Sequence, residues 1–241
     1  MIKIGWTPTN NAELALAYEL PDSVYKELYN NINSTFKLCP AFTSFMTNWY
    51  TVRSPIDVKF LYKKVSKTDA KITYSTPEAT PYISFNERKQ EWSPEFNFED
   101  RIKLEKNNNP LVSFSFHQLF VTDEKDLYVE QVPPFLHMYK LPYFKYLRTI
   151  PGAFNIHSWV RPFDFAYEIF TDNAVIDIKR GDPLCYLRFN THKKVKIEQI
   201  PFTQELEDYG KATTSLKNFI HGMSLSKMYE RFRRMRRPKL L

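Results

Sequence analysis

The sequence predicts a mainly β (α+β) protein, and three observations carry this prediction. Short apolar runs in which polar residues alternate recur along most of the chain, as expected for half-buried strands. Clusters of Pro, Asn, Asp and Gly separate these runs and mark turns. Helical spacing of apolar residues occurs only near the two ends of the chain. The pattern favours a β-sandwich, a jelly roll or a partly closed barrel.

The N-terminal part combines a short strand with one helix. The sequence IKIGW at residues 2–6 predicts the short strand. Beyond Pro21, Val24, Leu28 and Ile32 are spaced four apart, which predicts an N-terminal helix over about 23–33.

From Trp49 onward the apolar period is two, and Ile56, Val58, Phe60 and Tyr62 alternate with polar residues. Most of the 20 Phe, 15 Tyr and 4 Trp lie in such runs and are expected to form the core. The predicted strands after the helix are 56–62, 70–75, 81–86, 111–121, 127–132, 153–160, 164–170, 174–179, 184–190 and 194–200.

The chain divides into a single β-rich domain over 1–203 and a helical basic segment over 204–241. Residues 86–109 are charged and lack periodicity, so we expect an irregular surface insertion there. Residues 211–241 hold nine Lys and Arg and one Glu, a net charge of +8. The whole chain is +7, so residues 1–210 sum to −1 and the basicity lies in the C-terminal segment.

A basic amphipathic helix is predicted over 224–237. Its apolar stripe can dock on the protein's own body or on a partner, its arginines can bind nucleic-acid phosphates, and such helices can also lie on anionic membranes. The predicted polyanion or partner contacts are Arg231, Arg233, Arg234, Arg236, Arg237 and Lys239.

Several chemistries lack their sequence signals. The closest of the five glycines are 12 residues apart, which excludes a dinucleotide fingerprint, a P-loop and a GxSxG elbow. No histidine has the spacing of an HxD, HxE or HExxH metal motif, so we expect no metal and no cofactor, although His117, His137 and His157 could converge from different strands.

Location is indicated by what the sequence lacks. No apolar run is long enough to span a membrane, and the first residues do not resemble a secretion signal. Cys39 and Cys185 are interpreted as reduced thiols of a cytoplasmic protein.

Two polar clusters flank prolines at the predicted starts of strands. Arg53 and Asp57 surround Pro55, while Arg161 and Asp164 surround Pro162 and are followed by Glu168. Such an Arg–Asp pair is usually a structural clamp. The alternative is an anion pocket in which the arginine binds the ligand and the carboxylate orients it.

Four segments carry a resemblance to a known group of proteins. They are KLCPAFTSFMTNWYTVRSPIDVKF (37–60), VPPF (132–135), PGAFNIHSWVRPFDFAYEI (151–169) and IDIKRGDPLCYLRF (176–189). The chain resembles an uncharacterised hypothetical-protein family of tailed bacteriophages, of the cyanophage type, and of some bacteria. This resemblance implies a β-rich fold and a phage-type setting, in the host cytoplasm or the virion, and brings no activity with it.

The last strands are also similar to the closing hairpin of the dUTPase and dCTP-deaminase β-clip enzymes. That likeness implies a β-clip-like core and places Glu168 at the position of a catalytic Glu in the deaminases. Asn155 stands where an ionisable Asp is expected, and an amide cannot act as a general base.

The leading hypothesis is therefore a non-enzymatic accessory protein, a binding or assembly module whose basic C-terminal helix contacts a partner protein or nucleic acid. One alternative is a nucleotide-handling enzyme with a pocket at Arg161, Asp164 and Glu168. Another is a virion structural protein, which would form a homo-oligomer.

Overall fold

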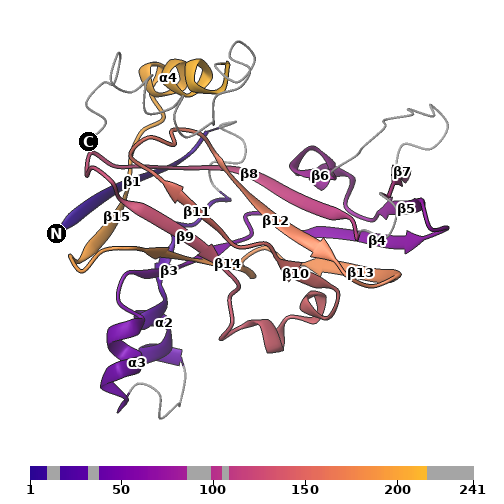
Figure 1. The fold of residues 1–241 in the computed structure, drawn as a ribbon, viewed down its shortest axis with the longest axis horizontal. Helices are drawn as coiled ribbons and strands as arrows, with labels where there is room; N and C mark the ends of the chain where they lie inside the picture. The colour runs from indigo at the N-terminus through magenta and orange to yellow at the C-terminus, as the bar shows by residue number, and fades with distance from the viewer. Residues whose placement is uncertain (10–16, 32–37, 86–98, 105–108, 216–241) are drawn as a thin grey trace.

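The computed structural model describes residues 1–9, 17–31, 38–85, 99–104 and 109–215, and this part of the chain is mainly β (Figure 1). Its helices are α2 (Val24–Asn31), α3 (Pro40–Phe45) and α4 (Gln204–Ser215), with the 3₁₀ turns η2 (Pro77–Tyr82), η3 (Met138–Lys140) and η4 (Pro142–Lys145). Its strands are β1 (Ile2–Pro8), β2 (Asp22–Ser23), β3 (Trp49–Arg53), β4 (Val58–Lys64), β5 (Asp69–Tyr74), β6 (Ile83–Phe85), β7 (Glu99–Lys103), β8 (Leu111–Val121), β9 (Tyr128–Val132), β10 (Leu147–Thr149), β11 (Gly152–Asn155), β12 (Phe163–Ile169), β13 (Asn173–Ile178), β14 (Pro183–Phe189) and β15 (Val195–Gln199).

The strands form three hydrogen-bonded sheets. Sheet A has the order β10-β12-β8-β1-β15, and β6 also pairs with β8. Sheet B has the order β11-β9-β14-β3-β2, and sheet C the order β13-β4-β5-β7. Most pairs are antiparallel, but β1 and β15 run parallel, which joins strands from the two ends of the described chain.

The three sheets share one hydrophobic core. Phe114 from sheet A, Leu187 from sheet B and Phe60 from sheet C are all fully buried in the same cluster. Aromatic rings contact one another across it: Phe60 and Phe114 have centroids 6.4 Å apart, and Phe114 and Tyr167 are 5.4 Å apart. The alternation that predicts the strands therefore also builds the core.

Strand β8 changes its pairing near its middle. His117 has φ 53°, a left-handed conformation rare for a non-glycine residue, and its carbonyl accepts hydrogen bonds from the Thr9 backbone N–H at 2.8 Å and from its hydroxyl at 3.1 Å. Opposite it, the β12 register shifts between Phe163 and Phe165. Beyond this bulge both faces of β8 are buried, and Leu119 packs in a second cluster beneath α4.

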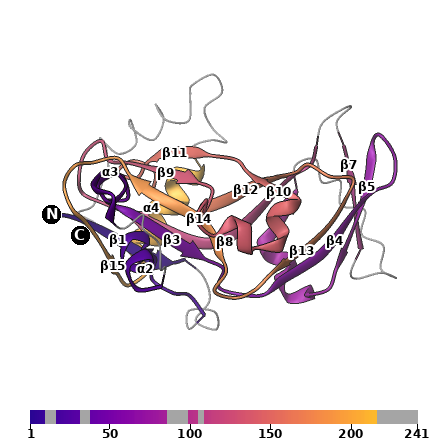
Figure 2. The same ribbon diagram turned by 90° about the horizontal axis from the view of Figure 1, so that it is seen from below.

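The helices lie on two opposite sides of the sheets. Helix α4 covers one side, whereas α2 and α3 project from the other (Figure 1). The 3₁₀ turns η3 and η4 lie on the same side as α2 and α3, as the view from below shows (Figure 2). In the described part of the chain, no helix is both long and apolar enough to cross a membrane.

A single asparagine joins sheet B to sheet A. Asn48 has φ 63° and is buried. Its amide donates to the carbonyls of Thr191 and Lys193 at 3.0 and 2.8 Å, and its side-chain oxygen accepts from the Val195 N–H at 2.9 Å. Asn tolerates the left-handed region better than most residues, so this position combines a backbone requirement with three hydrogen bonds.

The structure confirms the mainly β class, and each predicted strand overlaps an observed one. The predicted N-terminal helix corresponds to α2. Helix α3 and strands β3 and β10 lie outside the predicted elements, and the interpretation of 86–109 as irregular is wrong at β7, which pairs with β5. The predicted basic helix at 224–237 lies outside the described residues.

We expect Asn48→Ala to lower the free energy of unfolding by about 2–4 kcal/mol, because it removes three hydrogen bonds and leaves alanine in the left-handed region. Asn48→Gly accommodates the backbone and should cost about 1 kcal/mol less. Urea denaturation measures both. Asp126→Gly is the control, since exposed Asp126 also has a positive φ (57°). An Asn48→Gly variant as stable as the wild type would contradict the role of the hydrogen bonds.

Candidate interaction surface

A compact charged cluster fastens α2 to sheet B. Glu27 on α2 accepts hydrogen bonds from the Arg53 guanidinium at 2.5 Å and from the Thr51 hydroxyl at 3.0 Å, both on β3. Nε2 of His137 lies 3.1 Å from the same carboxylate. The side chains of Glu27, Arg53 and His137 are only 14–21% exposed, so the cluster is largely shielded from solvent.

The cluster continues through His137 to Tyr186 on β14. Nδ1 of His137 lies 2.5 Å from the Tyr186 hydroxyl. With the ring proton on Nε2, facing Glu27, Nδ1 accepts the Tyr186 hydroxyl hydrogen. Tyr186 is fully buried, and burial raises the pKa of its hydroxyl. The carboxylate, the imidazole and the hydroxyl bind one another and Arg53, so the geometry of this Glu–His–Tyr chain is that of a structural clamp.

The ionisation of Glu27 reflects these partners. Burial alone would raise its pKa, but the hydrogen bond from His137 and the positive charge of Arg53 outweigh burial and lower the pKa to about 2. The carboxylate is therefore charged, and its affinity for its donors contributes to folding at neutral pH.

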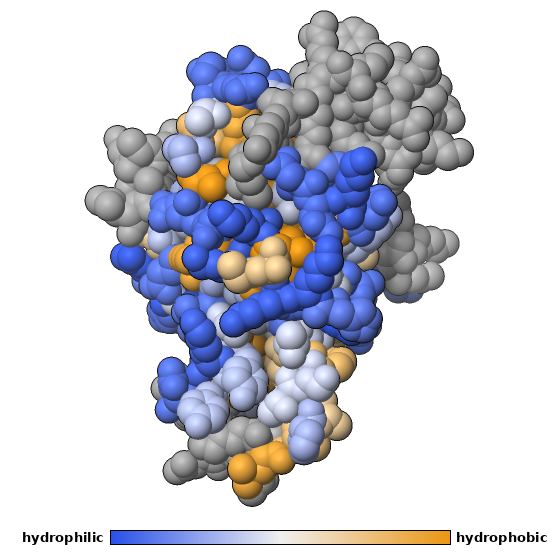
Figure 3. All heavy atoms as spheres, turned by 90° about the vertical axis from the view of Figure 1, so that its left-hand side faces the viewer, coloured by the Kyte–Doolittle hydropathy of each residue, from blue (hydrophilic) through white to orange (hydrophobic). Residues whose placement is uncertain are grey.

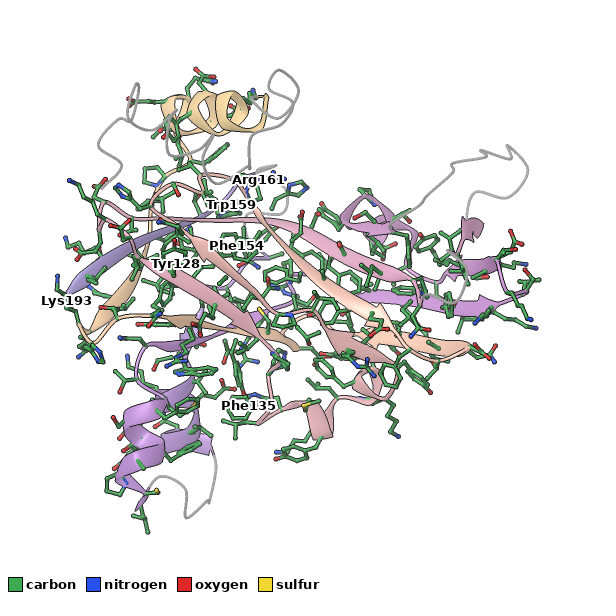
Figure 4. All side chains as sticks on the ribbon, in the orientation of Figure 1. Tyr128, Phe135, Phe154, Trp159, Arg161 and Lys193 are labelled. Carbon is green, nitrogen blue, oxygen red and sulfur yellow. The ribbon has the colours of Figure 1, made fainter. Side chains whose placement is uncertain are left out.

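An aromatic patch surrounds this clamp, defined here as Phe45, Phe135, Met138 and Tyr139. Their exposed fractions are 49%, 38%, 38% and 72%. Beneath them Trp49 is buried, with ring centroids 5.0 Å from Phe45 and 5.7 Å from Phe135. Figure 4 shows Phe135 on the side of the sheets that carries α2 and η3.

One end of the molecule exposes apolar residues at its tip. In the face drawn in Figure 3, hydrophilic residues cover much of the middle, apolar residues show among them, and an apolar group lies at the lower tip, at the end where Figure 1 places α2 and α3. Lone exposed apolar residues are normal on proteins. Here Phe45 and Phe135 both contact Trp49, and Met138 and Tyr139 closely follow Phe135 in the chain, and such a group often marks an interaction site.

The sequence-predicted polar residues fall into separate places. Arg53 donates to the Gly181 carbonyl at 2.8 Å, and Asp57 accepts the Arg180 N–H at 2.7 Å, so both hold the turn between β13 and β14. This geometry fits the clamp interpretation of that pair. Gly181 suits the turn, since its φ is +85°.

The second predicted group lies on β12 and on the segment just before it. Asp164 accepts the Ser115 hydroxyl at 2.5 Å, and Glu168 binds Arg148 at 3.0 Å. Arg161 lies over the Trp159 ring beneath α4 (Figure 4). The three side chains therefore have different partners, which lie on different segments of the described chain.

Sequence reasoning misses Glu27 and identifies His137 only as one of three histidines that could converge. Neither has a neighbouring motif, and their partners lie 24 to 110 positions away, so no local pattern identifies them. The described residues contain no group of three His, Cys, Asp or Glu side chains that could hold a metal ion. Cys39 and Cys185 are free thiols, the first exposed and the second buried.

Comparison of the chain with protein-family models finds no matching family, and a search of curated proteins finds no significant relative.

We expect Glu27→Gln to lower the free energy of unfolding by roughly 2–3 kcal/mol at pH 7. The lowered pKa means that the folded state favours the ionised carboxylate more than the unfolded state does. The carboxylate therefore stabilises the fold at every pH at which the carboxyl of the unfolded chain is ionised. This stability is present above about pH 4.5 and is lost as the pH falls toward 2. Denaturant titrations between pH 2 and 7 should show the two proteins converging at low pH. Glu130→Gln is the control, because its pair with Arg188 is more exposed and should contribute less than about 1 kcal/mol. A pH-independent difference for Glu27→Gln would contradict this account.

Proposed function

We propose that the protein is a binding or assembly module that contacts a partner protein through the aromatic patch. The proposal rests on the contrast between the largely shielded charged cluster and the exposed apolar side chains above it. The charged cluster is saturated by internal partners, whereas Phe45, Phe135, Met138 and Tyr139 are exposed above it. Aromatic residues and Met are enriched at protein interfaces, and aromatic residues are frequent among binding hot spots.

Charge indicates the chemistry of the partner. Lys140 lies 5.5 Å from the Tyr139 ring, and Arg188 lies over Phe45 and Trp49 at 5.4 and 5.7 Å. The nearby carboxylates are engaged, Glu27 by Arg53 and Glu130 by Arg188. Glu130 offsets Arg188, so Lys140 supplies the positive charge beside the exposed rings, which favours an apolar protein segment flanked by Asp or Glu.

The proposed biological setting is inferred from the sequence. The resemblance to phage hypothetical proteins supports a role as a phage accessory protein. We also propose that the core is a β-sandwich, a jelly roll or a β-clip-like fold. The nucleotide-enzyme alternative needs Arg161, Asp164 and Glu168 in one pocket. Their separate partners give that alternative no support.

Peptide selection tests the patch even though its partner is unidentified. We expect random-peptide display against the full-length protein to enrich peptides that combine apolar residues with Asp or Glu. Tyr139→Ser and Phe135→Ser should weaken a selected peptide about 10- to 30-fold, measured by fluorescence anisotropy, because each removes a candidate hot spot.

Tyr128→Ser is the matched control, since Tyr128 is also exposed (45%) but lies on β9, away from Phe135 (Figure 4). Its affinity should match that of the wild type. Thermal unfolding checks that Phe135→Ser remains folded, and Tyr139 is exposed enough (72%) that its replacement should not disturb the fold. Selected peptides that bind all three variants equally would refute the patch as the contact site.

The basic C-terminal segment provides a second proposed contact, with polyanions. Replacing Arg231, Arg233, Arg234, Arg236 and Arg237 by Gln in the full chain should weaken binding to a single-stranded oligonucleotide. The slope of log K against log salt should fall by about 0.7 for each phosphate that the segment no longer binds. Replacing Lys193, Lys194 and Lys196 by Gln is the control. An unchanged salt slope in the arginine variant would exclude this segment as the polyanion-binding site.

A further inference from the structure

Sheet C carries a positive charge that the net charge of the body conceals. Its hairpin of β4 and β5, residues 58–74, holds five Lys and one Asp, a net charge of +4. Residues 171–180, which contain β13, hold two Asp, one Lys and one Arg and add no net charge. Strand β7 holds two acidic and two basic residues and adds none either. Figures 1 and 2 show sheet C at the end of the molecule away from α2, α3 and α4, so this charge forms a separate surface.

Two lysines of this hairpin are available to a partner. The other three are engaged within the chain: Lys59 by Asp177 at 3.7 Å, Lys64 by Asp172 at 3.4 Å, and Lys71 by its own contacts. Lys63 and Lys67 are exposed, and in the described part of the chain no carboxylate lies within ion-pair distance of either. The charge that this surface offers to a partner is therefore that of these two side chains.

The turn that carries Lys67 is held in place by the only carboxylate of the hairpin. Asp69 accepts hydrogen bonds from the hydroxyls of Ser66 and Thr68, both at 2.9 Å. The backbone N–H groups of Val65 and Ser66 also donate to the Asp69 carbonyl, at 2.9 and 3.0 Å. Lys67 is therefore exposed on an ordered turn at the tip of the hairpin.

A hollow of about 390 Å³ lies beside Lys63 on the same sheet. Leu61 and Val175, which are directly opposite each other, form its apolar wall. Asn173 and Thr73 line it together with Lys63, and Asn173 lies directly opposite Lys63 in the β13–β4 pair, so the side chains of this pair share one face of the sheet. An ammonium group, an amide and a hydroxyl thus surround one space as hydrogen-bond donors. Side chains of these kinds bind phosphate oxygens in nucleic-acid complexes.

We propose that the hairpin binds the phosphate backbone of double-stranded nucleic acid through Lys63, Lys67 and the donors of the hollow. A duplex carries about one negative charge per 1.7 Å of its axis, and such an array engages lysines at separate positions, whereas a small anion would meet only one of them. Lysine is depleted in protein interfaces, which disfavours a protein partner for this face. Phosphate contacts carry no sequence information, so we expect binding without sequence preference. The surface uses residues outside the aromatic patch and the basic C-terminal segment and goes beyond both proposed contacts.

Titration of the full-length protein with a short DNA duplex at several salt concentrations, followed by fluorescence anisotropy, tests the two lysines. Lys63→Gln together with Lys67→Gln should weaken binding about 10-fold or more at low salt and reduce the slope of log K against log salt by about 1.8, because each phosphate contact contributes about 0.9. Lys26→Gln together with Lys125→Gln is the matched control and should leave the slope unchanged, since both lysines are exposed and lie on other elements. Lys125 follows Glu124, the partner of Lys193, which Figure 4 shows at the opposite end of the molecule from sheet C.

A second variant tests the hollow without removing a lysine. Asn173→Asp places a carboxylate opposite Lys63, where it offsets the ammonium group and repels phosphate, so duplex binding should weaken about 10-fold or more. Asn30→Asp adds the same charge at an exposed position on α2 and should have little effect. Thermal unfolding checks that each variant is folded. No duplex binding by the wild type, an unchanged slope in the lysine variant, or undiminished binding by a folded Asn173→Asp variant would overturn the proposal.

The C-terminal arginines are tested separately, because their proposed contact is also with polyanions. In the full chain with Arg231, Arg233, Arg234, Arg236 and Arg237 replaced by Gln, the two lysine substitutions should still reduce the slope by about 1.8. This result would support the hairpin even if the C-terminal contact fails, whereas loss of the effect would exclude the hairpin as an independent site. Phosphatidylserine vesicles represent the other polyanionic partner. Lysine-dependent binding to vesicles without binding to the duplex would contradict the assignment to nucleic acid.

Discussion

The hydrogen bonds of Asn48 are the constraint on which the arrangement of the sheets depends. The side chain uses both amide hydrogens and its oxygen on the segment that leads into β15, and its own carbonyl accepts the Phe189 N–H at 3.1 Å. Tyr50, two residues on, donates its hydroxyl to the Val195 carbonyl at 2.7 Å. Sheets A and B are thus held together by polar side chains as well as by the shared core. Trp49, the residue after Asn48, donates its ring N–H to the Phe45 carbonyl at 2.6 Å and forms the base of the aromatic patch.

The Glu27 cluster illustrates why a shielded ion pair contributes to specificity as well as to stability. Taking charges out of water is costly, and the cost is recovered only when each group finds good partners. Here Glu27 has donors from Arg53, Thr51 and His137, so moving α2 would leave several polar groups without partners at once. Apolar contacts alone would tolerate sliding of so short a helix. The cluster defines one position for α2, and the exposed rings beside it are held in a fixed arrangement.

Sequence patterns predict the strands because alternation depends on neighbouring residues, and the core is built from those same residues. They fail where tertiary contacts decide. Strand β7 has a charged sequence and forms because β5 offers it an edge, and its Ile102 belongs to the buried core. The polar residues beside Pro55 and Pro162 are conspicuous by their spacing, but their partners lie on distant segments. Arg53 binds Gly181, 128 positions later, and no local pattern encodes such a contact.

A net charge of −1 over residues 1–210 suggests a body without a charged surface, but a sum does not describe where charges lie. Near α2, Glu27 and Glu130 are engaged by arginines, and Lys140 adds positive charge beside the exposed rings. Near α4, Glu207 is engaged by Lys211. Because paired groups offset each other locally, it is Lys140 that gives the end of the body near the exposed rings a positive charge that the sum conceals. The attraction of anions to this protein therefore need not depend on its basic C-terminal segment alone.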